Sequence, residues 1–411
     1  MRAARALVVL AFLPRVVVAQ GNPVGPEFRV NTYTTNAQRY PSVARSGSGD
    51  FLVVWSSSDQ DGSSLGVFGQ RHSGSGVPLG PEFRVNTYTT GQQAFPAVAS
   101  DGAGSFVVVW QSPDGLAEGI FGQRYDSSGA PLGPEFRVNT NTANSQTRPS
   151  VAVDSAGNFV VVWQGGSLSN YDVFGQRYTS SGTPLGPEFR VNTYAGQPFS
   201  SGPKPSISSD SSGNFVVIWE GAYGSAISGQ RYSNAGVPLG SEFIVVMSCL
   251  PCLNFSPSVA SESAGDFVVV WASSYPYGPA NNAIVGQRYA SSGAALGGKF
   301  QASTYEAAYQ SDPHVASDAS GNFVVVWASE AEDGSLGGVF GRRFSGSGAG
   351  LGLEFRVNAY TSQAQKDAAV AALGNFVVAW SSNAQDGSAY GIFGQRFNMI
   401  VPVELMRFGV E

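Results

Sequence analysis

Tryptophan recurs at an almost constant interval along the chain. Successive tryptophans lie 52 to 56 residues apart, and every tryptophan belongs to the series Trp55, Trp110, Trp163, Trp219, Trp271, Trp327 and Trp380. Self-similarity at a period of about 50 residues is typical of propellers and other repeat arrays. The repeat therefore constrains the fold more than any local motif does.

Each unit contains four runs that are predicted to be strands. In the third unit they are residues 149–154 (PSVAVD), 158–163 (NFVVVW), 173–178 (VFGQRY) and 187–193 (PEFRVNT). The second run is apolar at consecutive rather than alternating positions, which predicts burial on both faces. Glycine-containing loops separate the first run from the second and the third from the fourth, as expected of antiparallel hairpins.

Seven units of four short antiparallel strands predict an all-β fold, a seven-bladed β-propeller. Radial closure covers both faces of every blade, whereas an open array would leave two apolar faces in water. A length of 411 residues would otherwise suggest more than one domain, but the repeat predicts a single one. The seven tryptophans are expected to be core residues of this fold.

The two ends of the repeat complement each other. Residues 25–32 (GPEFRVNT) match a fourth strand and precede the first complete unit, while the seventh unit stops after its third strand, residues 392–397 (IFGQRF). We expect the N-terminal strand to complete the last blade, which removes an open sheet edge. The propeller then spans residues 20–397, and the tail, residues 398–411, is the alternative source of the missing strand.

Residues 1–19 predict a signal peptide. Arg2 and Arg5 precede an apolar run, residues 6–13, and the expected cleavage site follows the small residue Ala19, as in secretory signals. No later stretch has the ~18 apolar residues of a membrane span. We expect a secreted protein that is extracellular, periplasmic or at the cell surface, has no transmembrane segment in the mature chain, and is monomeric.

The charge pattern argues against nucleic acid as a partner. The formal net charge is -6, and the chain has only three lysines, Lys204, Lys299 and Lys366. No basic stripe is present to hold a phosphate backbone.

Departures from the repeat cluster in two connections of each unit. These are the connection between the second and third strands and the one that leads from the fourth strand into the next unit. Examples are residues 194–205, which are lengthened, and residues 245–255, which read VVMSCLPCLNF. In a propeller these connections share one rim, and the hairpins of constant length share the other. Variable loops on a constant scaffold are where function is expected.

Acidic residues, several of them followed by glycine, occupy the connection after tryptophan on the variable rim. They are Asp59, Asp61, Asp114, Asp172, Asp333 and Asp386. Turn formation by Asp and Gly explains this pattern, and a ligand-binding acidic rim is the functional interpretation. Calcium takes about six to eight oxygen ligands, and none of these loops provides that number alone. Calcium is therefore a possible cofactor that the sequence does not require, and no other cofactor or metal is indicated.

Cys249 and Cys252 (CLPC) are the only cysteines. In an exported protein we expect them to form a local disulfide. Free thiols are the alternative. Redox or metal chemistry is a third interpretation, although no helical pattern surrounds the pair to lower a thiol pKa.

Arginine and glutamate recur 11 residues apart across the hairpin between the third and fourth strands. The pairs are Arg71 with Glu82, Arg124 with Glu135, Arg177 with Glu188, Arg231 with Glu242, and Arg343 with Glu354. Facing positions on antiparallel strands predict cross-strand ion pairs.

No residue is predicted to be catalytic. The two histidines, His72 and His314, lie near no nucleophile motif and share no cluster, so they make a poor zinc site. Acids from different blades can converge on a polysaccharide, but nothing in the sequence selects a pair.

Three segments, residues 50–87, 104–140 and 321–358, approximate the pattern GxFVVVWxSxxxDGSxxGxFGQRYxxxGxxxGxEFRVNT. It resembles repeats of large secreted bacterial proteins of the RTX and adhesin type. The segment VAxDxxGNFVVVW is similar to the start of NHL-type propeller repeats. The resemblance covers residues 25–397 and implies export and a propeller, with no catalytic residues to transfer.

We therefore expect a secreted or surface propeller that binds carbohydrate or a surface protein through the variable rim. A structural or interaction unit of a cell-envelope assembly is the alternative. A polysaccharide hydrolase or lyase is the third, because no acid, base or nucleophile stands out from the repeat.

Overall fold

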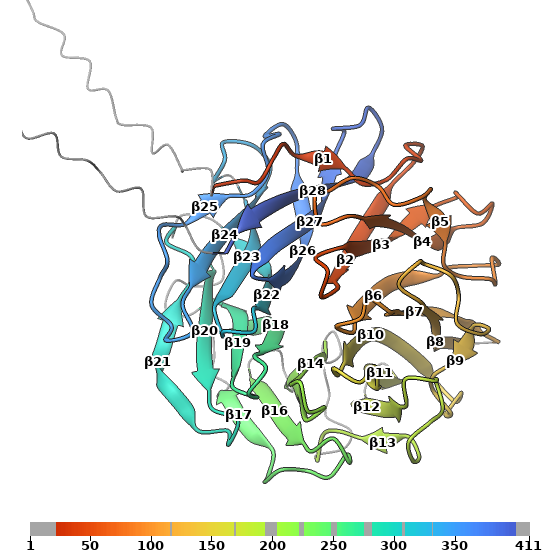
Figure 1. The fold of residues 1–411 in the computed structure, drawn as a ribbon, viewed down its shortest axis with the longest axis vertical. Coiled ribbons are helices and arrows are strands. Elements are labelled where there is room, and N and C mark those ends of the chain that lie inside the picture. The colour runs from red at the N-terminus through yellow and green to blue at the C-terminus, as the bar shows by residue number, and fades with distance from the viewer. Residues whose placement is uncertain are drawn as a thin grey trace, which may run out of the picture.

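The computed structural model describes residues 22–115, 117–167, 170–193, 204–221, 226–247, 253–274, 282–305, 309–330 and 332–399. The expected signal peptide, residues 1–19, and the cysteine pair, Cys249 and Cys252, lie outside these ranges. Within them the protein is a seven-bladed β-propeller of four-stranded antiparallel sheets (Figure 1). No helix in the described ranges is both long and apolar enough to cross a bilayer.

The blades follow the chain in order. Blade one consists of β2 (Gln38–Arg45), β3 (Phe51–Ser58), β4 (Leu65–His72) and β5 (Phe83–Arg84). Blade two consists of β6 (Ala94–Ser100), β7 (Phe106–Asp114), β8 (Ala117–Tyr125) and β9 (Phe136–Arg137). Blade three consists of β10 (Ser145–Val153), β11 (Phe159–Ser167), β12 (Asn170–Tyr178) and β13 (Phe189–Arg190). Blade four consists of β14 (Ser206–Ser209), β15 (Phe215–Glu220), β16 (Ile227–Tyr232) and β17 (Phe243–Val246). Blade five consists of β18 (Asn254–Ser261), β19 (Phe267–Ser273), β20 (Ala283–Tyr289) and β21 (Ala295–Gln301). Blade six consists of β22 (Gln310–Ser317), β23 (Phe323–Ser329), β24 (Gly338–Phe344) and β25 (Phe355–Arg356). Blade seven consists of β26 (Gln365–Leu373), β27 (Asn375–Asn383), β28 (Tyr390–Asn398) and β1 (Phe28–Arg29).

The N-terminal strand closes the ring, as the repeat predicted. Strand β1 pairs antiparallel with β28, so that Phe28 lies opposite Gly394 and Arg29 opposite Phe393. The Val30 N–H donates to the Ile392 carbonyl at 2.8 Å. The outer place in the seventh sheet is therefore filled by β1 and not by the tail.

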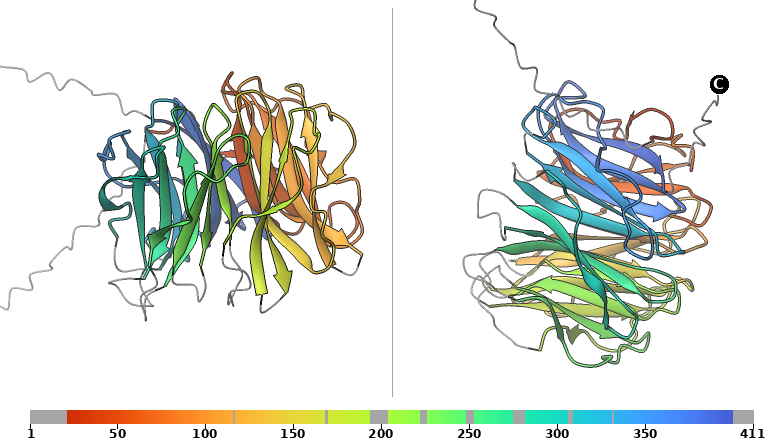
Figure 2. Two further views of the ribbon diagram at one scale, coloured as in Figure 1. Left: turned by 90° about the horizontal axis from the view of Figure 1, so that it is seen from below. Right: turned by 90° about the vertical axis from the view of Figure 1, so that its left-hand side faces the viewer.

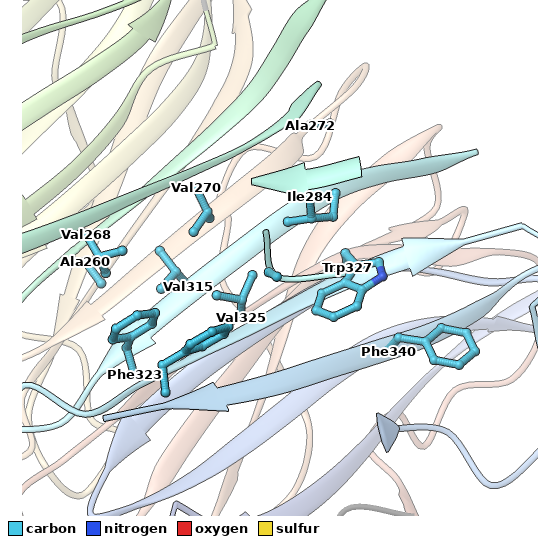
Figure 3. Close-up of a cluster of buried hydrophobic side chains, with 12 residues drawn as sticks. Ala260, Val268, Val270, Ala272, Ile284, Val315, Phe323, Val325, Trp327 and Phe340 are labelled. Carbon is cyan, nitrogen blue, oxygen red and sulfur yellow. The ribbon is translucent and has the colours of Figure 1, made fainter. Parts of the chain in front are cut away.

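The core lies between blades rather than within them. Seven buried clusters each combine residues of two neighbouring blades. In the cluster of Figure 3, Phe323, Val325 and Trp327 pack against the fifth blade, while Val324 and Val326 pack against the seventh. The second strand of each blade is sandwiched in this way, which explains its consecutive apolar residues. All seven tryptophans are buried, with exposed fractions of 3% or less.

The predicted ion pairs across the outer hairpin are not formed. The ion pairs among the described residues are Arg39–Asp367 and Arg137–Asp114. Because Gly69 lies opposite Phe83, the register places residue 70, not Arg71, opposite residue 82. A register difference of one residue directs side chains to opposite faces. The prediction was wrong by that one position.

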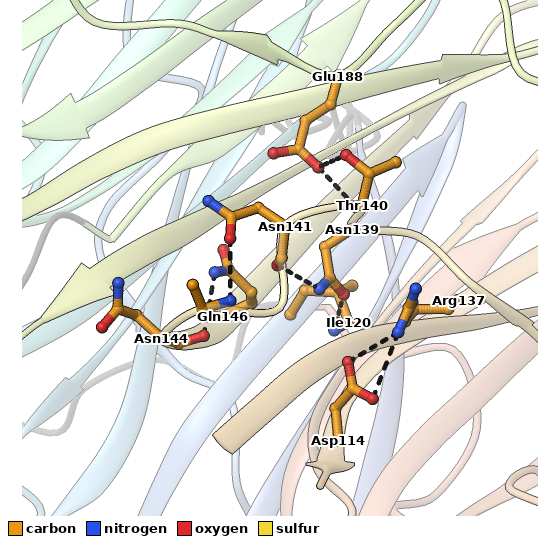
Figure 4. Close-up of polar contacts among 10 residues, drawn as sticks. Asp114, Ile120, Arg137, Asn139, Thr140, Asn141, Asn144, Gln146 and Glu188 are labelled. Carbon is orange, nitrogen blue, oxygen red and sulfur yellow. Dashed lines mark hydrogen bonds and ion pairs between the residues drawn. The ribbon is translucent and has the colours of Figure 1, made fainter. Parts of the chain in front are cut away.

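In four of the five predicted pairs both members instead bond to a neighbouring blade, and in the fifth Glu354 does so while the Arg343 guanidinium packs over the rings of Phe355 and Phe376. Arg124 Nη1 donates to the Ser180 carbonyl of the next blade at 2.7 Å. Glu188 Oε2 accepts bonds from the backbone N–H and the hydroxyl of Thr140 in the preceding blade, at 2.7 and 2.9 Å (Figure 4). Equivalent Arg contacts are made by Arg71, Arg177, Arg231, Arg288 and Arg396, and equivalent Glu contacts by Glu27, Glu82, Glu135, Glu242 and Glu354. We call these the inter-blade contacts.

The strands run between two rims (Figure 2). The hairpins that join first to second and third to fourth strands lie on one rim. The connections from second to third strand, and from each fourth strand to the next blade, lie on the other. The innermost strand of each blade therefore begins at the variable rim.

Candidate functional site at the channel mouth

The acids predicted on the variable rim each bond within or beside their own loop. Asp61 Oδ1 accepts from the Ser63 N–H at 3.3 Å, and its Oδ2 accepts from Asn86 Nδ2 at 3.2 Å. Asp114 forms an ion pair with Arg137 at 3.2 Å (Figure 4). The others have similar local partners: Asp59 with Asn36, Asp172 with Asn192, Asp333 with Ser335, and Asp386 with Ser388 and Asn31.

These acids are not brought together. Asp59 and Asp61 belong to the first blade, and the other four belong to the second, third, sixth and seventh blades. Over the described part of the chain, no group of three or more His, Cys, Asp or Glu residues is arranged to hold a metal ion. The contacts of the rim acids are therefore local, and ligand binding by the acidic rim stays a prediction.

A different set of residues converges, at a bulge in the innermost strand of each blade. In the first blade Arg39 pairs with Ser56 and Ser42 with Val54, so that Tyr40 and Pro41 together oppose Trp55. The same irregularity recurs opposite the tryptophan of the second, third, fifth, sixth and seventh blades. A β-bulge redirects a side chain locally, and the buried tryptophan packs beneath each bulge.

The first residue of the bulge has an unusual backbone conformation. Its φ is +57° at Tyr40, +52° at Phe95, +55° at Arg148, +51° at Ser256, +47° at Asp312 and +55° at Asp367. Positive φ is rare for residues with a side chain, and a following proline normally favours extended conformations. Such strain costs of the order of 1–3 kcal/mol per residue and concentrates at functional sites.

The bulge residues surround a cavity in the central channel. This cavity has a volume of about 600 Å³ and is lined by the innermost strands of all seven blades. That volume lies within the range typical of ligand pockets. We call the six bulge residues and Lys204, the equivalent residue of the fourth blade, the channel ring: Tyr40, Phe95, Arg148, Lys204, Ser256, Asp312 and Asp367. Since the bulges lie near the start of each innermost strand, the ring lies toward the variable rim.

Residues that follow tryptophan hold several bulges in place from the preceding blade. The Phe95 N–H donates to Ser56 Oγ at 3.2 Å, and the Arg148 N–H donates to Gln111 Oε1 at 3.4 Å. The Ser256 N–H donates to Glu220 Oε1 at 2.7 Å. The strained backbone is thus tied to its neighbour, which fixes the direction of the ring side chains.

Several ring side chains contact each other around the channel. The rings of Tyr40 and Phe95 lie 4.7 Å apart between centroids. Lys204 Nζ donates to Ser256 Oγ at 3.1 Å, and this hydroxyl donates to Asp312 Oδ1 at 2.9 Å.

The strand residue before Tyr40 also reaches the ring. Two guanidinium nitrogens of Arg39 lie 3.3 Å from Asp367 Oδ2, and the guanidinium also packs over the Tyr40 ring at 4.6 Å. The ring therefore changes in character from aromatic, through cationic, to acidic around its circumference.

Two titratable groups lie close to the ring. Glu220 is 3% exposed; burial raises the pKa of its carboxyl, while Lys204 and Arg148 oppose that rise. His314 is exposed to the channel lumen but enclosed by the surrounding blades. Enclosure lowers the pKa of His314 despite the opposing effect of Asp312 and Asp367. A neutral imidazole therefore faces the cavity near neutral pH.

The sequence contains a signal for this ring in the variation between units. The ring position precedes the Pro of the PSVA motif, or its equivalent in the seventh blade. It holds six residue types in seven units, beside a proline that recurs in six of them. A comparison of the seven units position by position identifies it, whereas the length of the loops pointed to the rim.

The sequence matches no known family model and no curated protein. Solved structures resemble it in fold. The polysaccharide lyase Uly1 is 10% identical with a TM-score of 0.53, over 95% of this chain and 94% of that one. An α-L-arabinanase of Penicillium chrysogenum in complex with arabinobiose is 12% identical with a TM-score of 0.51, over 75% and 93%.

A third structure is a propeller by its own description. It is the β-propeller domain of the Trilobed protease of Pyrococcus furiosus, which has an open velcro topology; it is 8% identical with a TM-score of 0.50, over 92% of this chain and 99% of that one. At these identities the likeness shows the fold alone. Together with the sheets described above, it identifies the chain as a β-propeller protein.

Proposed function

We propose that this protein is an exported carbohydrate-binding β-propeller whose ligand enters the channel ring. The observation that carries the proposal is the ring itself, in which strained backbone, an aromatic pair and polar side chains line one cavity. Ligand sites typically combine apolar walls with a few polar groups that fix orientation. Sugars suit such a site because their C–H faces pack on aromatic rings and their hydroxyls bond to carboxylates and serine.

The occurrence of carbohydrate-active proteins among the structures of similar fold is compatible with this proposal but does not carry it. One of those neighbours is a polysaccharide lyase and another was solved with arabinobiose. The support for carbohydrate binding by this chain comes from its own ring residues. The acidic rim, with or without calcium, is the other part of the surface that a long polymer could contact.

The first experiment is binding of residues 20–411 to a panel of glycans and polysaccharides, with and without calcium. The test variant is Tyr40→Ala with Phe95→Ala, and the control is Tyr88→Ala, which removes an exposed aromatic outside the ring. We expect saturable binding by the wild type and the control, and at least about tenfold weaker binding by the double variant, since aromatic packing contributes about 0.5–1.5 kcal/mol per pair beyond area burial.

Two outcomes would overturn the proposal. Binding that survives the double variant but is lost in Asp61→Asn or Asp386→Asn would move the site to the acidic rim. Absence of glycan binding under every condition would favour a surface protein as partner or a structural unit of an envelope assembly.

An enzymatic role is the second candidate, and one observation favours it. Asp312 and Asp367 occupy neighbouring blades, and His314 faces the same cavity. Carboxylates that flank a glycosidic bond can act as acid and base. Incubation with each bound polysaccharide, followed by chromatography of the products, decides between the roles. Release of oligosaccharides that stops in Asp312→Asn would establish an enzyme.

A further inference from the structure

We infer that the ligand of the channel ring is an acidic carbohydrate whose anionic group binds Arg148 while its sugar ring packs on Tyr40 and Phe95. This inference rests on the proposed function and adds the ligand class to it. It follows from the order of residues around the channel and from which of their charges are already engaged.

The two arginines next to aromatic ring residues differ in their partners. Arg39 is paired with Asp367 at 3.3 Å and covers the Tyr40 ring. Arg148 is half-buried, lines the cavity, and forms no ion pair within the described ranges. Its backbone N–H is held by Gln111, and its φ of +55° sets the direction of the side chain. Arg148 is therefore a positioned cation with its charge available to a ligand.

Glu220, whose charge Arg148 influences, has a hydrogen-bond partner of its own. Burial raises the pKa of Glu220, and the positive charges of Lys204 and Arg148 oppose that rise. The Glu220 carboxylate is buried and accepts a hydrogen bond from the Ser256 N–H. Lys204 is engaged with Ser256. The guanidinium of Arg148 is planar and suits a carboxylate or sulfate, to which it can donate two hydrogen bonds at once.

The neighbouring blades supply the rest of an acidic sugar site. Phe95 is the ring residue of the blade before Arg148, and it lies against Tyr40. Asp312 and Asp367 lie in the sixth and seventh blades, away from Arg148 in the order of the ring. Their negative charges repel an anion, so they favour one orientation, in which sugar hydroxyls face the acids and the anionic group faces Arg148.

The test is calorimetric titration of residues 20–411 with three oligosaccharides of matched length: oligogalacturonate, neutral galacto-oligosaccharide and sulfated galacto-oligosaccharide. We expect at least one of the two acidic sugars to bind about tenfold or more tightly than the neutral one, and this preference to shrink as salt is added. The two acidic ligands share the anion chemistry, and the comparison between them shows whether carboxylate or sulfate is preferred.

The variants separate the role of Arg148 from a general effect of charge. Arg148→Gln is expected to weaken binding of the preferred acidic sugar about tenfold or more and to leave the neutral sugar unchanged. Arg148→Lys, which keeps the charge but not the planar geometry, is expected to fall between. Lys366→Gln is the control, because Lys366 lies beside the ring over Tyr390 on the acidic side. We expect it to change affinity less than twofold.

The outcomes distinguish this inference from the proposed function. Equal binding of neutral and acidic sugars, with both lost in Tyr40→Ala plus Phe95→Ala, would overturn the ligand class and retain the carbohydrate site. An acidic preference that persists in Arg148→Gln would overturn the role of Arg148. Absence of binding to all three sugars and to the wider glycan panel would overturn both proposals. Thermal unfolding of each variant confirms that it is folded.

Discussion

The inter-blade contacts and the channel ring both repeat once per blade, yet they differ in how far the sequence varies. The inter-blade contacts use arginine in six described blades and glutamate in six. The channel ring uses six residue types in seven positions. Each arginine or glutamate must reach a fixed backbone group of its neighbour, whereas a ring side chain faces the open lumen. In this molecule, constancy marks packing between blades, and variation marks the residues that line the channel.

The largest effect is expected where a constant residue is lost from the core. Trp163 is fully buried and its indole N–H donates to Gln146 Oε1 at 2.8 Å. Trp163→Ala should lower the free energy of unfolding by about 3–5 kcal/mol, measured by urea denaturation. Leu132→Ala, at a 37% exposed position, is the control and should change it by less than about 0.5 kcal/mol. A similar loss in both would mean that the repeat does not mark the core.

The next largest effect is expected at His72, which departs from the repeat at a buried position. His72 takes a position held by Tyr or Phe in the other blades, is 1% exposed, and stacks on Phe51. Burial lowers its pKa to about 4. In the unfolded chain the His72 imidazole becomes protonated below about pH 6.5, whereas in the folded protein it stays neutral down to about pH 4. The free energy of unfolding is therefore highest above about pH 6.5 and falls by about 3 kcal/mol as the pH drops to about 4.

His72→Tyr should remove this loss and His72→Phe should do the same, measured as thermal unfolding between pH 4 and pH 8. In other blades the corresponding hydroxyl donates to a backbone carbonyl of the preceding blade, as Tyr178 does to Val138 at 3.2 Å. An unchanged pH dependence in both variants would show that His72 is not the titrating group.

A smaller effect is expected at a second departure. Gln60 and Gln385 donate to Glu82 and Glu27 at 2.5 Å, but Glu332 has the corresponding place beside Glu354. Burial, together with a hydrogen bond to Glu354 and its charge, raises the pKa of Glu332. The native state then holds a proton that the unfolded chain releases above about pH 4.3, so stability falls as the pH rises from that value.

Glu332→Gln should therefore stabilise the protein by about 1 kcal/mol at pH 8 and have little effect at pH 4. Glu330→Gln removes the same charge from an exposed neighbouring position and serves as the control. Equal stabilisation by both variants would indicate a general effect of net charge and no special pairing with Glu354.

The smallest effect is a gain in stability at a channel-ring residue, in contrast to the loss expected from a substitution in the core. Arg148→Gly relieves the cost of positive φ but increases the freedom of the unfolded chain. The net expectation is a gain of about 0.5 kcal/mol in stability together with the loss of acidic sugar binding. Ser150→Gly, two residues further along the same strand, should instead lose about 0.5–1 kcal/mol. A loss of stability at Arg148 would mean that the ring is not strained.

The sequence was sufficient for the fold because each blade repeats the same local signals. The consecutive apolar residues before Trp163 can be buried on both faces only between two neighbouring blades. The N-terminal strand at Phe28 belongs to no complete unit, so it needs a sheet that lacks its outer strand, and β28 provides that edge. These are effects of pattern, which sequence reasoning can evaluate. The repeated arginines and glutamates were also recognised, but a register difference of one residue changed their partners.

The site was not predictable in the same way. Tyr40 looks like an ordinary strand residue in sequence, and only the two-to-one pairing with Trp55 turns it into the lumen. Convergence of Tyr40, Phe95 and Arg148 depends on radial closure, since they lie more than 50 residues apart in sequence. The rim acids, in contrast, stood out by composition, and in the structure they bond to local loop partners.

The pairing of β1 with β28 also has a consequence in time. Phe28 is made early, but its partner Gly394 comes near the far end of the chain. Contacts between such distant residues are slow to form, so six blades can assemble before the seventh obtains its outer strand. During that interval both β1 and the edge of β28 are unpaired, and the matching strand of a second molecule fits equally well. Folding at high dilution should therefore favour the closed ring over exchanged dimers.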